Sequence, residues 1–344
     1  MAEFISTFIT GFQGVVKTDL EARFPAIKIL NLYDGLVHYK FDGDSRQLEK
    51  IKYFNNTFFV LKTMKGRGVS FPSLAGAVCS SKNYFLVNKG SFRVRFQNEN
   101  QFAKVDKNLT RRVEEYVSRN SKLKLDRLSP TNEIWFCIRR EGFAFCGELI
   151  SKREFTEKNL NKGELRPEIA YLICSFAGIQ SGDVVLEPFC GYGSIPVQLA
   201  KRFKCSKIYA SDIDDEKVKM ISCGALRQAQ GPQTAQGPQT AQGVQIDLRQ
   251  ADAFELAHIQ DNLIDKIITD PPWGLWENIP DIEDFYNKMF VSFKRVLKSD
   301  GKMVILTARK EEFERAAAHA DLKIETSLRT LVNGKKAGLY YLYK

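Results

Sequence analysis

The sequence predicts an α/β protein in which an open, mostly parallel sheet follows smaller α+β modules. From residue 182 onwards, buried strands and helices alternate, which is typical of a parallel sheet covered by helices. Before residue 150, strands with period-2 apolar spacing are mixed with short helices, as in α+β modules. The expected parts are two α+β modules, a linker and the parallel-sheet domain, at residues 1–62, 63–150, 151–164 and 165–344.

Length and composition indicate a globular protein with unpaired cysteines. The 344 residues are enough for two or three domains, and no apolar run is long enough for a membrane span. The first residues lack the basic segment of a signal peptide, so we expect a cytoplasmic protein without a membrane partner. The seven cysteines lack Cys-x-x-Cys spacing and the three histidines are isolated, so no metal site is assigned. The oligomeric state stays open.

Basic residues are concentrated in the N-terminal half. Residues 51–127 contain sixteen Lys or Arg and five Asp or Glu, a net charge of +11, whereas the whole chain carries +10. The remainder is therefore almost neutral. A basic region beside a neutral one is typical of a protein that binds the phosphate backbone of a nucleic acid. A solvated surface of dispersed lysines would give the same count, so charge alone leaves both interpretations open.

Residues 1–62 predict a ferredoxin-like module. Their apolar spacing and turn residues indicate alternating strands and helices. A Tyr-Asp-Gly turn at 33–35 joins two of the strands in a hairpin. The expected strands cover 3–8, 27–32, 35–41 and 57–61, and the expected helices lie within 11–24 and 45–54.

Residues 63–150 predict a second α+β unit. A half-exposed strand at 91–97 precedes an amphipathic helix at 107–120. The other expected elements are a helix at 73–79 and strands at 84–87, 133–139 and 142–149. Cations on the strand and on the outer face of the amphipathic helix are candidates for binding a nucleic acid: Arg93, Arg95, Lys107, Arg111, Arg112 and Arg119.

Aromatic residues in the same strands have two possible roles. Phe92, Phe96 and Trp135 could stack on nucleobases. They occupy alternate strand positions, which direct side chains to one face of a sheet. We therefore expect them in the core.

A rigid loop ends the fourth strand of the C-terminal domain, expected to begin at Ile264. It reads Asp270-Pro271-Pro272-Trp273. The two prolines restrict the backbone and withhold two N–H donors, so the loop offers the Asp270 carboxylate and backbone carbonyls as acceptors. An exocyclic amine of a nucleobase brings donors that fit such a loop, and Trp273 would stack on the base.

Acidic residues lie at or just after the ends of the three preceding strands, which are expected at 183–187, 207–211 and 244–249. Glu187, Asp212 and Asp252 join Asp270 at four successive strand ends, the edge where open α/β sheets bind ligands. Asp212 is placed to accept hydrogen bonds from ribose hydroxyls. After Glu187, the turn Pro188–Ser194 opens a helix at 195–203, and its small residues let a ligand approach the backbone. The third glycine of a dinucleotide site is absent, because Pro196 stands there.

The last quarter of the chain predicts further helices at 284–297 and 311–320 and a strand at 301–307. Two strands joined at Asn333-Gly334 form a terminal hairpin, at 322–331 and 338–343. Residues 228–243 contain a repeated Ala-Gln-Gly-Pro-Gln-Thr segment without large apolar residues, which predicts a flexible insertion. Its role, if any, stays open.

Two motifs resemble class I S-adenosylmethionine-dependent methyltransferases. Asp-Pro-Pro-Trp fits the [DNS]-P-P-[YFW] motif of enzymes that methylate amino groups, and Glu-Pro-x-Cys-Gly-x-Gly is similar to the first motif of the class. The resemblance implies a Rossmann-like, seven-stranded sheet with an antiparallel last strand. It also implies an S-adenosylmethionine site at Glu187, Pro188, Cys190, Gly191, Gly193, Asp212, Ile213, Asp252 and Ala253, and a catalytic loop at Asp270, Pro271, Pro272 and Trp273.

The N-terminal half resembles the THUMP domain of RNA-modifying enzymes over roughly residues 60–150. The resemblance rests on Phe-Arg-Val-Arg-Phe at 92–96, the Arg-rich helix and Ile-Trp-Phe-Cys-Ile at 134–138. Leu-Arg-Pro-x-x-Ala at 165–170 is similar to THUMP-linked guanine-N2 methyltransferases, in which this helix start lines the cofactor pocket. The resemblance implies an RNA partner gripped at the acceptor end of a tRNA, and methylation of guanine N2.

Other functions remain open at this point. The same chemistry on ribosomal RNA or on adenine N6 of DNA would use the same catalytic loop. A non-catalytic RNA-binding scaffold would keep the fold and lose the cofactor, although the intact acids and loop argue against it. The target nucleotide is not determined by the sequence.

Overall fold

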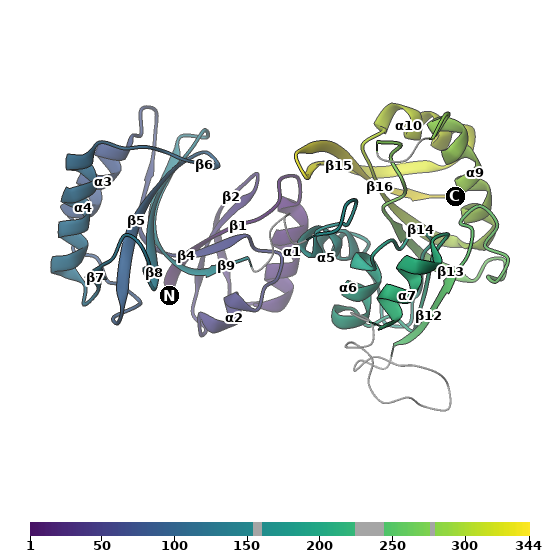
Figure 1. Ribbon diagram of the computed structural model, residues 1–344, viewed down its shortest axis with the longest axis horizontal. Helices are drawn as coiled ribbons and strands as arrows, with labels where there is room; N and C mark the ends of the chain where they lie inside the picture. Colours follow the sequence, from purple (N-terminus) through teal and green to yellow (C-terminus); the bar gives the residue numbers. More distant parts are fainter. Residues whose placement is uncertain (154–159, 224–243, 276–278) are drawn as a thin grey trace. The chain divides into compact units, whose positions relative to one another are not determined.

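A computed structural model describes residues 1–153, 160–223, 244–275 and 279–344. The chain folds into two compact units (Figure 1). Unit 1 comprises Met1–Phe8 and Leu20–Glu154, and unit 2 comprises Ile9–Asp19 and Phe155–Lys344. No helix within the described residues is long and apolar enough to cross a membrane. The predicted insertion at 228–243 lies outside the described residues.

Unit 1 is built on a nine-stranded sheet with the order β2-β3-β1-β4-β9-β8-β5-β6, and β7 pairs with β5. Strand β4 runs through the predicted boundary between residues 62 and 63, so the two predicted N-terminal modules share this sheet. The strands are β1 (Ala2–Thr7), β2 (Lys28–Tyr33), β3 (Leu36–Phe41), β4 (Asn56–Lys65), β5 (Ser91–Asn98), β6 (Gln101–Phe102), β7 (Lys124–Leu125), β8 (Asn132–Arg139) and β9 (Phe143–Lys152). The helices of residues 1–153 are α1 (Gln13–Arg23), α2 (Arg46–Glu49), α3 (Phe71–Cys79) and α4 (Lys107–Asn120).

Helices α3 and α4 lie together against one face of the β5–β8 region (Figure 1). Helix α4 begins where the Asp106 carboxylate accepts hydrogen bonds from the backbone N–H groups of Asn108 and Leu109, which satisfies two donors of the first turn. Phe92 and Phe96 pack under these helices. Trp135 is buried in a second cluster. The prediction that these three aromatic residues belong to the core is confirmed.

Two predicted elements of unit 1 differ from the structure. The strand expected at 84–87 is wrong, because the N–H groups of Leu86 and Val87 donate to the buried Glu148 carboxylate, at 2.8 and 2.9 Å, instead of to a neighbouring strand. Helix α2 is shorter than the expected 45–54. After Glu49 the chain continues in tighter turns, in which Ile51 N–H bonds to Leu48 O.

Unit 2 contains a seven-stranded sheet with the order β12-β11-β10-β13-β14-β16-β15. Strand β16 is antiparallel to both of its neighbours, whereas the pairs from β12 to β14 are parallel. This confirms the predicted sheet and its antiparallel last strand. The strands are β10 (Val184–Glu187), β11 (Lys207–Asp212), β12 (Gln245–Gln250), β13 (Ile264–Thr269), β14 (Leu297–Thr307), β15 (Lys323–Val332) and β16 (Lys335–Tyr343).

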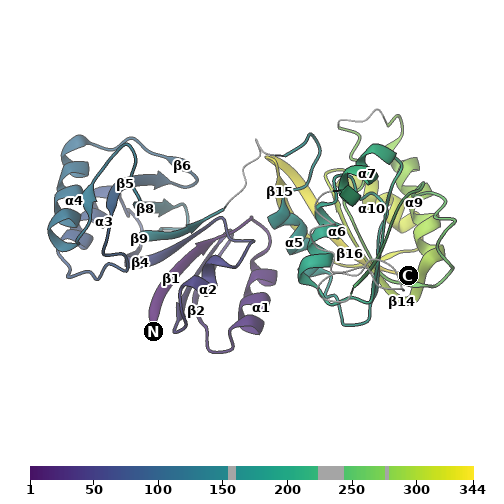
Figure 2. The ribbon, with the colours of Figure 1, turned by 60° about the horizontal axis from the view of Figure 1, so that its bottom comes forward.

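Helices cover both faces of the unit 2 sheet (Figure 2). Helices α5 and α6 lie against one face, and α9 and α10 lie against the other (Figures 1 and 2). The helices are α5 (Pro167–Phe176), α6 (Ser194–Arg202), α7 (Asp215–Cys223), α9 (Ile282–Val296) and α10 (Lys310–His319).

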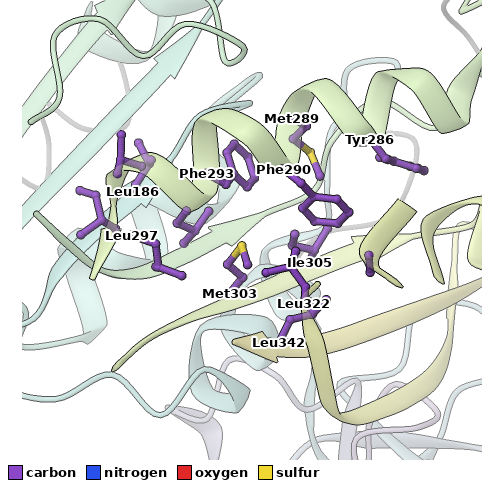
Figure 3. Packing of buried hydrophobic residues seen from close by; sticks show 14 of the residues in the cluster. Leu186, Tyr286, Met289, Phe290, Phe293, Leu297, Met303, Ile305, Leu322 and Leu342 are labelled. Atoms are coloured by element: carbon purple, nitrogen blue, oxygen red, sulfur yellow. The ribbon is translucent and has the colours of Figure 1, made fainter. Parts of the chain in front are cut away.

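The main core of unit 2 lies under α9 (Figure 3). Tyr286, Met289, Phe290 and Phe293 recur at helical spacing and are fully buried against the sheet, where Ile305 of β14 is among their neighbours. Burying side chains of this size stabilises a fold by roughly 1.5–3 kcal/mol each. The core therefore holds β13 and β14 rigidly, and the predicted catalytic loop follows β13.

Candidate active site

The four predicted acids lie at one edge of the unit 2 sheet. Strands β12, β11, β10 and β13 are neighbours and parallel, so their carboxyl ends meet at that edge. Glu187 ends β10 and Asp212 ends β11, while Asp252 and Asp270 follow β12 and β13. Sheet register thus brings together groups that are up to 83 residues apart in the chain. The predicted convergence of these acids is present in the structure.

Glu187 is the most deeply buried acid of this edge. Its side chain is fully buried, and its Oε1 accepts hydrogen bonds from the Thr269 hydroxyl at 2.7 Å and from Phe189 N–H at 3.1 Å. Its Oε2 has no hydrogen-bond partner among the described residues. Burial raises the pKa of Glu187 well above its usual range, and the charges of Asp270 and Asp212 raise it further. This oxygen therefore fits the cationic group of a ligand.

The turn after Glu187 presents backbone to the same edge. Gly193 adopts φ 87° and opens helix α6, and a Cβ there would lie 3.0 Å from the Ile221 side chain. Gly193 N–H donates to Cys190 O at 2.7 Å, and Cys190 N–H donates to Ser211 O at 2.9 Å. The buried Cys190 packs in this turn, and burial raises the pKa of its thiol, which keeps the thiol neutral.

Asp212 connects the turn to the second strand. One of its oxygens accepts Gly191 N–H at 2.8 Å, and the other accepts Asp214 N–H at 3.0 Å. An ionised carboxylate has about four acceptor positions, so Asp212 can also accept from the hydroxyls of a ligand. Ile213, beside it, is 69% exposed and offers an apolar surface. The arrangement fits a ribose next to a flat ring.

Asp252 and Ala253 complete the predicted cofactor side. Asp252 Oδ1 accepts Phe254 N–H at 2.8 Å, which orients the carboxylate. Ala253 is buried, and its carbonyl accepts the Ser292 hydroxyl at 2.6 Å. Contacts from helix α9 therefore hold this segment in place.

The Asp270–Trp273 loop contains a hydrogen bond that sequence reasoning missed. The indole N–H of Trp273 donates to Asp270 Oδ1 at 2.9 Å. Trp273 was predicted only as a stacking surface, whereas here it also orients the carboxylate. Pro271 is buried and Trp273 is half-buried, so the loop is anchored at one side and accessible at the other.

Two further residues of the site were not predicted. Thr269 donates to Glu187, and Arg309 Nε donates to the Trp273 carbonyl at 3.0 Å. Thr269 gave one signal in the sequence, because it is a hydroxyl residue in an otherwise apolar strand directly before Asp270. Arg309 gave none, since its partner is 36 residues earlier in the chain.

The predicted Leu-Arg-Pro helix start is tied to the same turn. The Ser194 hydroxyl, in the first turn of α6, donates to the Leu165 carbonyl at 2.7 Å. Glu168, in the first turn of α5, is buried, and its Oε2 lies 3.5 Å from Arg166 Nε. The contact between Ser194 and Leu165 places the start of this segment beside the glycine-containing turn.

The six predicted RNA-binding cations lie in unit 1 and fall into two groups. Arg93 and Arg95 both face Glu133, and hydrogen bonds from Arg93 and Trp135 lower the pKa of Glu133 in spite of its burial. Arg93 is therefore engaged in a partly buried ion pair. On helix α4 the other four cations are exposed, and two of them share Glu115: Lys107, Arg111, Arg112 and Arg119.

A cavity of about 600 Å³ in unit 1 was not predicted. Glu141 and three glycines line part of it. The other charged and aromatic lining residues are four cations and one tyrosine: Lys65, Arg67, Arg139, Arg140 and Tyr33. Arg139 is held in place, because its Nη2 donates to the Asp34 carbonyl at 2.6 Å. The cations come from the end of β4, the following loop and the β8–β9 turn. Pairing of β4 with β9 brings these segments together, and this pairing could not be read from local sequence.

Comparison with known proteins identifies a methyltransferase family. The family described as "RMKL-like, methyltransferase domain" matches residues 153–338. A protein named tRNA (guanine(6)-N2)-methyltransferase from Thermus thermophilus is 27% identical over 239 residues, which cover 67% of this chain and 66% of that protein. A protein of the same name from Methanocaldococcus jannaschii is 21% identical over 385 residues, which cover 99% of both proteins.

The fold also has a counterpart among solved structures. The crystal structure of TrmN from Thermus thermophilus matches 100% of both chains with a TM-score of 0.78 and 20% sequence identity. This likeness confirms the predicted α/β fold across the whole chain.

Proposed function

Because this chain belongs to the RMKL-like methyltransferase domain family, we propose that it transfers a methyl group from S-adenosylmethionine to the exocyclic N2 amine of a guanosine in tRNA. The observation that carries this proposal is the Asp270–Trp273 loop at the carboxyl end of β13, which offers oriented acceptors and an aromatic surface. The names of the two relatives support tRNA and guanine N2 as the substrate.

The residues at the sheet edge fit the cofactor. When bound, S-adenosylmethionine supplies an electrophilic methyl group on a sulfonium. Glu187 Oε2, which has no hydrogen-bond partner in the described part of the chain, suits its cationic methionine end, and Asp212 suits the ribose hydroxyls. Ile213 offers a surface for the adenine, whose edge Asp252 would contact. Because Cys190 is buried and burial raises the pKa of its thiol, the proposal gives it no role as a nucleophile.

The catalytic loop positions the amine. The lone pair of an aromatic amine is delocalised into the base, which makes the nitrogen a weak nucleophile. Hydrogen bonds from its N–H groups to Asp270 and to the Pro271 carbonyl would fix the nitrogen, and Trp273 would stack on a base turned out of its helix. As the nitrogen bonds to the methyl carbon, the carbon–sulfur bond would break and S-adenosylhomocysteine would leave, and the amine would lose one proton to the Asp270 carboxylate or to water. This direct transfer needs no side-chain nucleophile.

The reaction is tested by incubating the protein with labelled S-adenosylmethionine and separate samples of total tRNA, ribosomal RNA and duplex DNA. We expect labelled N2-methylguanosine in the tRNA sample after nucleoside analysis. Label restricted to ribosomal RNA would move the substrate to that RNA, and label in N6-methyladenine of DNA would contradict the guanine assignment. Absence of both label and cofactor binding would favour a non-catalytic RNA-binding scaffold.

The basic cavity of unit 1 extends the RNA-binding surface that we propose. The double variant R67E/R140E places two acids in the cavity, and K107E reverses one exposed charge on helix α4. We expect tRNA affinity to fall by about tenfold or more in the double variant. The slope of log affinity against log salt concentration should become shallower by about one for each lost phosphate contact.

A charge reversal away from these surfaces controls for net charge. Arg46 of α2 is 81% exposed and pairs with exposed Asp44, so R46E reverses one surface charge, which is half of the change in R67E/R140E. It should leave tRNA affinity within about twofold. Equal losses of affinity per reversed charge in R46E and R67E/R140E would show that net charge, and not the cavity, governs binding.

A further inference from the structure

Arg309 connects the catalytic loop to the neighbouring strand. It follows the end of β14, which pairs with β13, and opens helix α10. Its side chain reaches across to the loop, where Nε donates to the Trp273 carbonyl at 3.0 Å. The far end of its guanidinium lies near Gly274. One side chain thus contacts the loop from the segment between β14 and α10.

The backbone of Arg309 is itself anchored. Its N–H donates to the Thr307 hydroxyl at 2.9 Å, and that hydroxyl is hydrogen-bonded to the Tyr286 hydroxyl at 2.8 Å. Thr307 and Tyr286 are fully buried in the core of unit 2. The position from which Arg309 reaches the loop is therefore set by packed residues of β14 and α9.

The catalytic loop receives a hydrogen-bond donor from outside its own residues. Pro271 and Pro272 have no backbone N–H, so these positions cannot tie the loop to the sheet by donating hydrogen bonds. Arg309 supplies a donor to the carbonyl of Trp273, and the indole of Trp273 in turn donates to Asp270. The orientation of the Asp270 carboxylate thus depends on where Arg309 holds the end of the loop.

We propose that Arg309 is a positioning residue for methyl transfer, which acts by holding Trp273 so that its indole orients Asp270. The inference deepens the proposed function and rests on it for the activity measurement. Arg309 also lies 3.8 Å from Glu312 and its side chain is 38% exposed. A cation in this place could instead contact a phosphate of the substrate, and the experiment separates the two roles.

The kinetic test compares R309M, R309K and R315M. Displacing catalytic groups by about 1 Å can cost about 10²-fold in rate, so we expect R309M and R309K to lower kcat by about 10- to 100-fold. The KM for RNA and the Kd for S-adenosylhomocysteine should stay within about twofold. R309K keeps the charge and lacks the guanidinium Nε, so it separates hydrogen-bond geometry from charge.

R315M is the matched control on the same helix. Arg315 pairs with Glu283 at 2.8 Å and is 57% exposed, and R315M should keep wild-type kcat. A raised KM for RNA with unchanged kcat in R309M, restored by R309K, would assign Arg309 to substrate charge and overturn the proposal.

A second measurement tests the contact without activity. The chain has three tryptophans, so incorporated 5-fluorotryptophan should give three fluorine NMR resonances, and W273F identifies that of Trp273. We expect R309M, but not R315M, to shift the Trp273 resonance and leave the buried Trp135 unchanged. An unmoved Trp273 resonance would overturn the inference. A shifted resonance in a protein that methylates no RNA would refute the proposed function and leave the contact standing.

Discussion

Replacing Asp270 with alanine is expected to lower kcat for methyl transfer by about 10²–10³-fold, the range found when one oriented group is removed from a preorganised site. Asp270 is the carboxylate that Trp273 orients, and it follows β13 at the sheet edge where the cofactor residues converge. The alanine removes an acceptor for the substrate amine and the partner of the indole N–H. The measurement is single-turnover methylation with saturating RNA and cofactor.

The neutral variant D270N refines this test. Its amide oxygen can still accept from the Trp273 indole, while the negative charge is lost. We expect a smaller loss of rate, about tenfold, than for D270A. Cofactor affinity should stay within a few-fold in both variants.

A surface carboxylate provides the control for Asp270. Asp261 is 64% exposed and pairs with Arg295 at 2.6 Å, so D261N should leave kcat unchanged. Wild-type activity in D270A would refute the role of the loop. Loss of cofactor binding together with activity in D270A would instead place Asp270 in the cofactor site.

Replacing Glu187 with glutamine is expected to weaken S-adenosylmethionine binding by about 100-fold and to stabilise the cofactor-free protein. The carboxylate has one oxygen without a hydrogen-bond partner among the described residues and is fully buried. Removing the charge leaves the cationic end of the cofactor without its counter-ion. A buried hydrogen-bonded charge pair that loses one partner costs about 2–5 kcal/mol, which corresponds to this loss of affinity.

The stability effect depends on pH in a defined direction. Because burial raises the pKa of Glu187 in the folded protein, the folded state keeps its proton at a pH where the unfolded chain has released it. The free energy of unfolding therefore carries no penalty from Glu187 below the ordinary carboxyl pKa of about 4.5. It decreases as the pH rises from there towards the raised pKa of the folded protein. E187Q does not titrate, so its advantage over the wild type should grow across that interval.

Thermal unfolding measures this effect. Without cofactor at pH 8, we expect the Tm of E187Q to exceed that of the wild type by at least about 2–4 °C, the shift that accompanies 1 kcal/mol in a domain of this size. At pH 4 the difference should vanish. E255Q changes an exposed glutamate of unit 2 and should behave as wild type in both measurements. A lower Tm for E187Q at pH 8 would mean that Glu187 is held ionised by a protein cation.

The order of strands and helices in unit 2 was predictable, because its apolar periods and turn residues are local features. The amphipathic helix at 107–120 was predicted with the bounds of α4 for the same reason. The structure of segment 84–87 was not predicted. Leu86 N–H donates to the carboxylate of Glu148, which lies 62 residues later in the chain. A short apolar run does not reveal a partner so distant.

The candidate site was predictable to the same extent. Acids at the ends of successive parallel strands must meet at one edge, so Glu187, Asp212, Asp252 and Asp270 could be grouped from their places in the chain. Which donors those acids use could not be inferred. Likewise, the ion pair between Glu133 and Arg93, a predicted RNA contact, could not be inferred from the sequence.

By itself, the sequence determined the strand and helix pattern, the rigid Asp270–Trp273 loop and the basic character of the N-terminal half, because each follows from local spacing, backbone restriction or charge. Only the tertiary structure decided that Trp273 orients Asp270, that Arg309 holds Trp273, and that four cations surround one cavity. These are contacts between side chains and carbonyls whose separation depends on strand register and helix packing. A hydrogen bond is formed or lost within a few tenths of an ångström, and sequence spacing does not specify positions that finely.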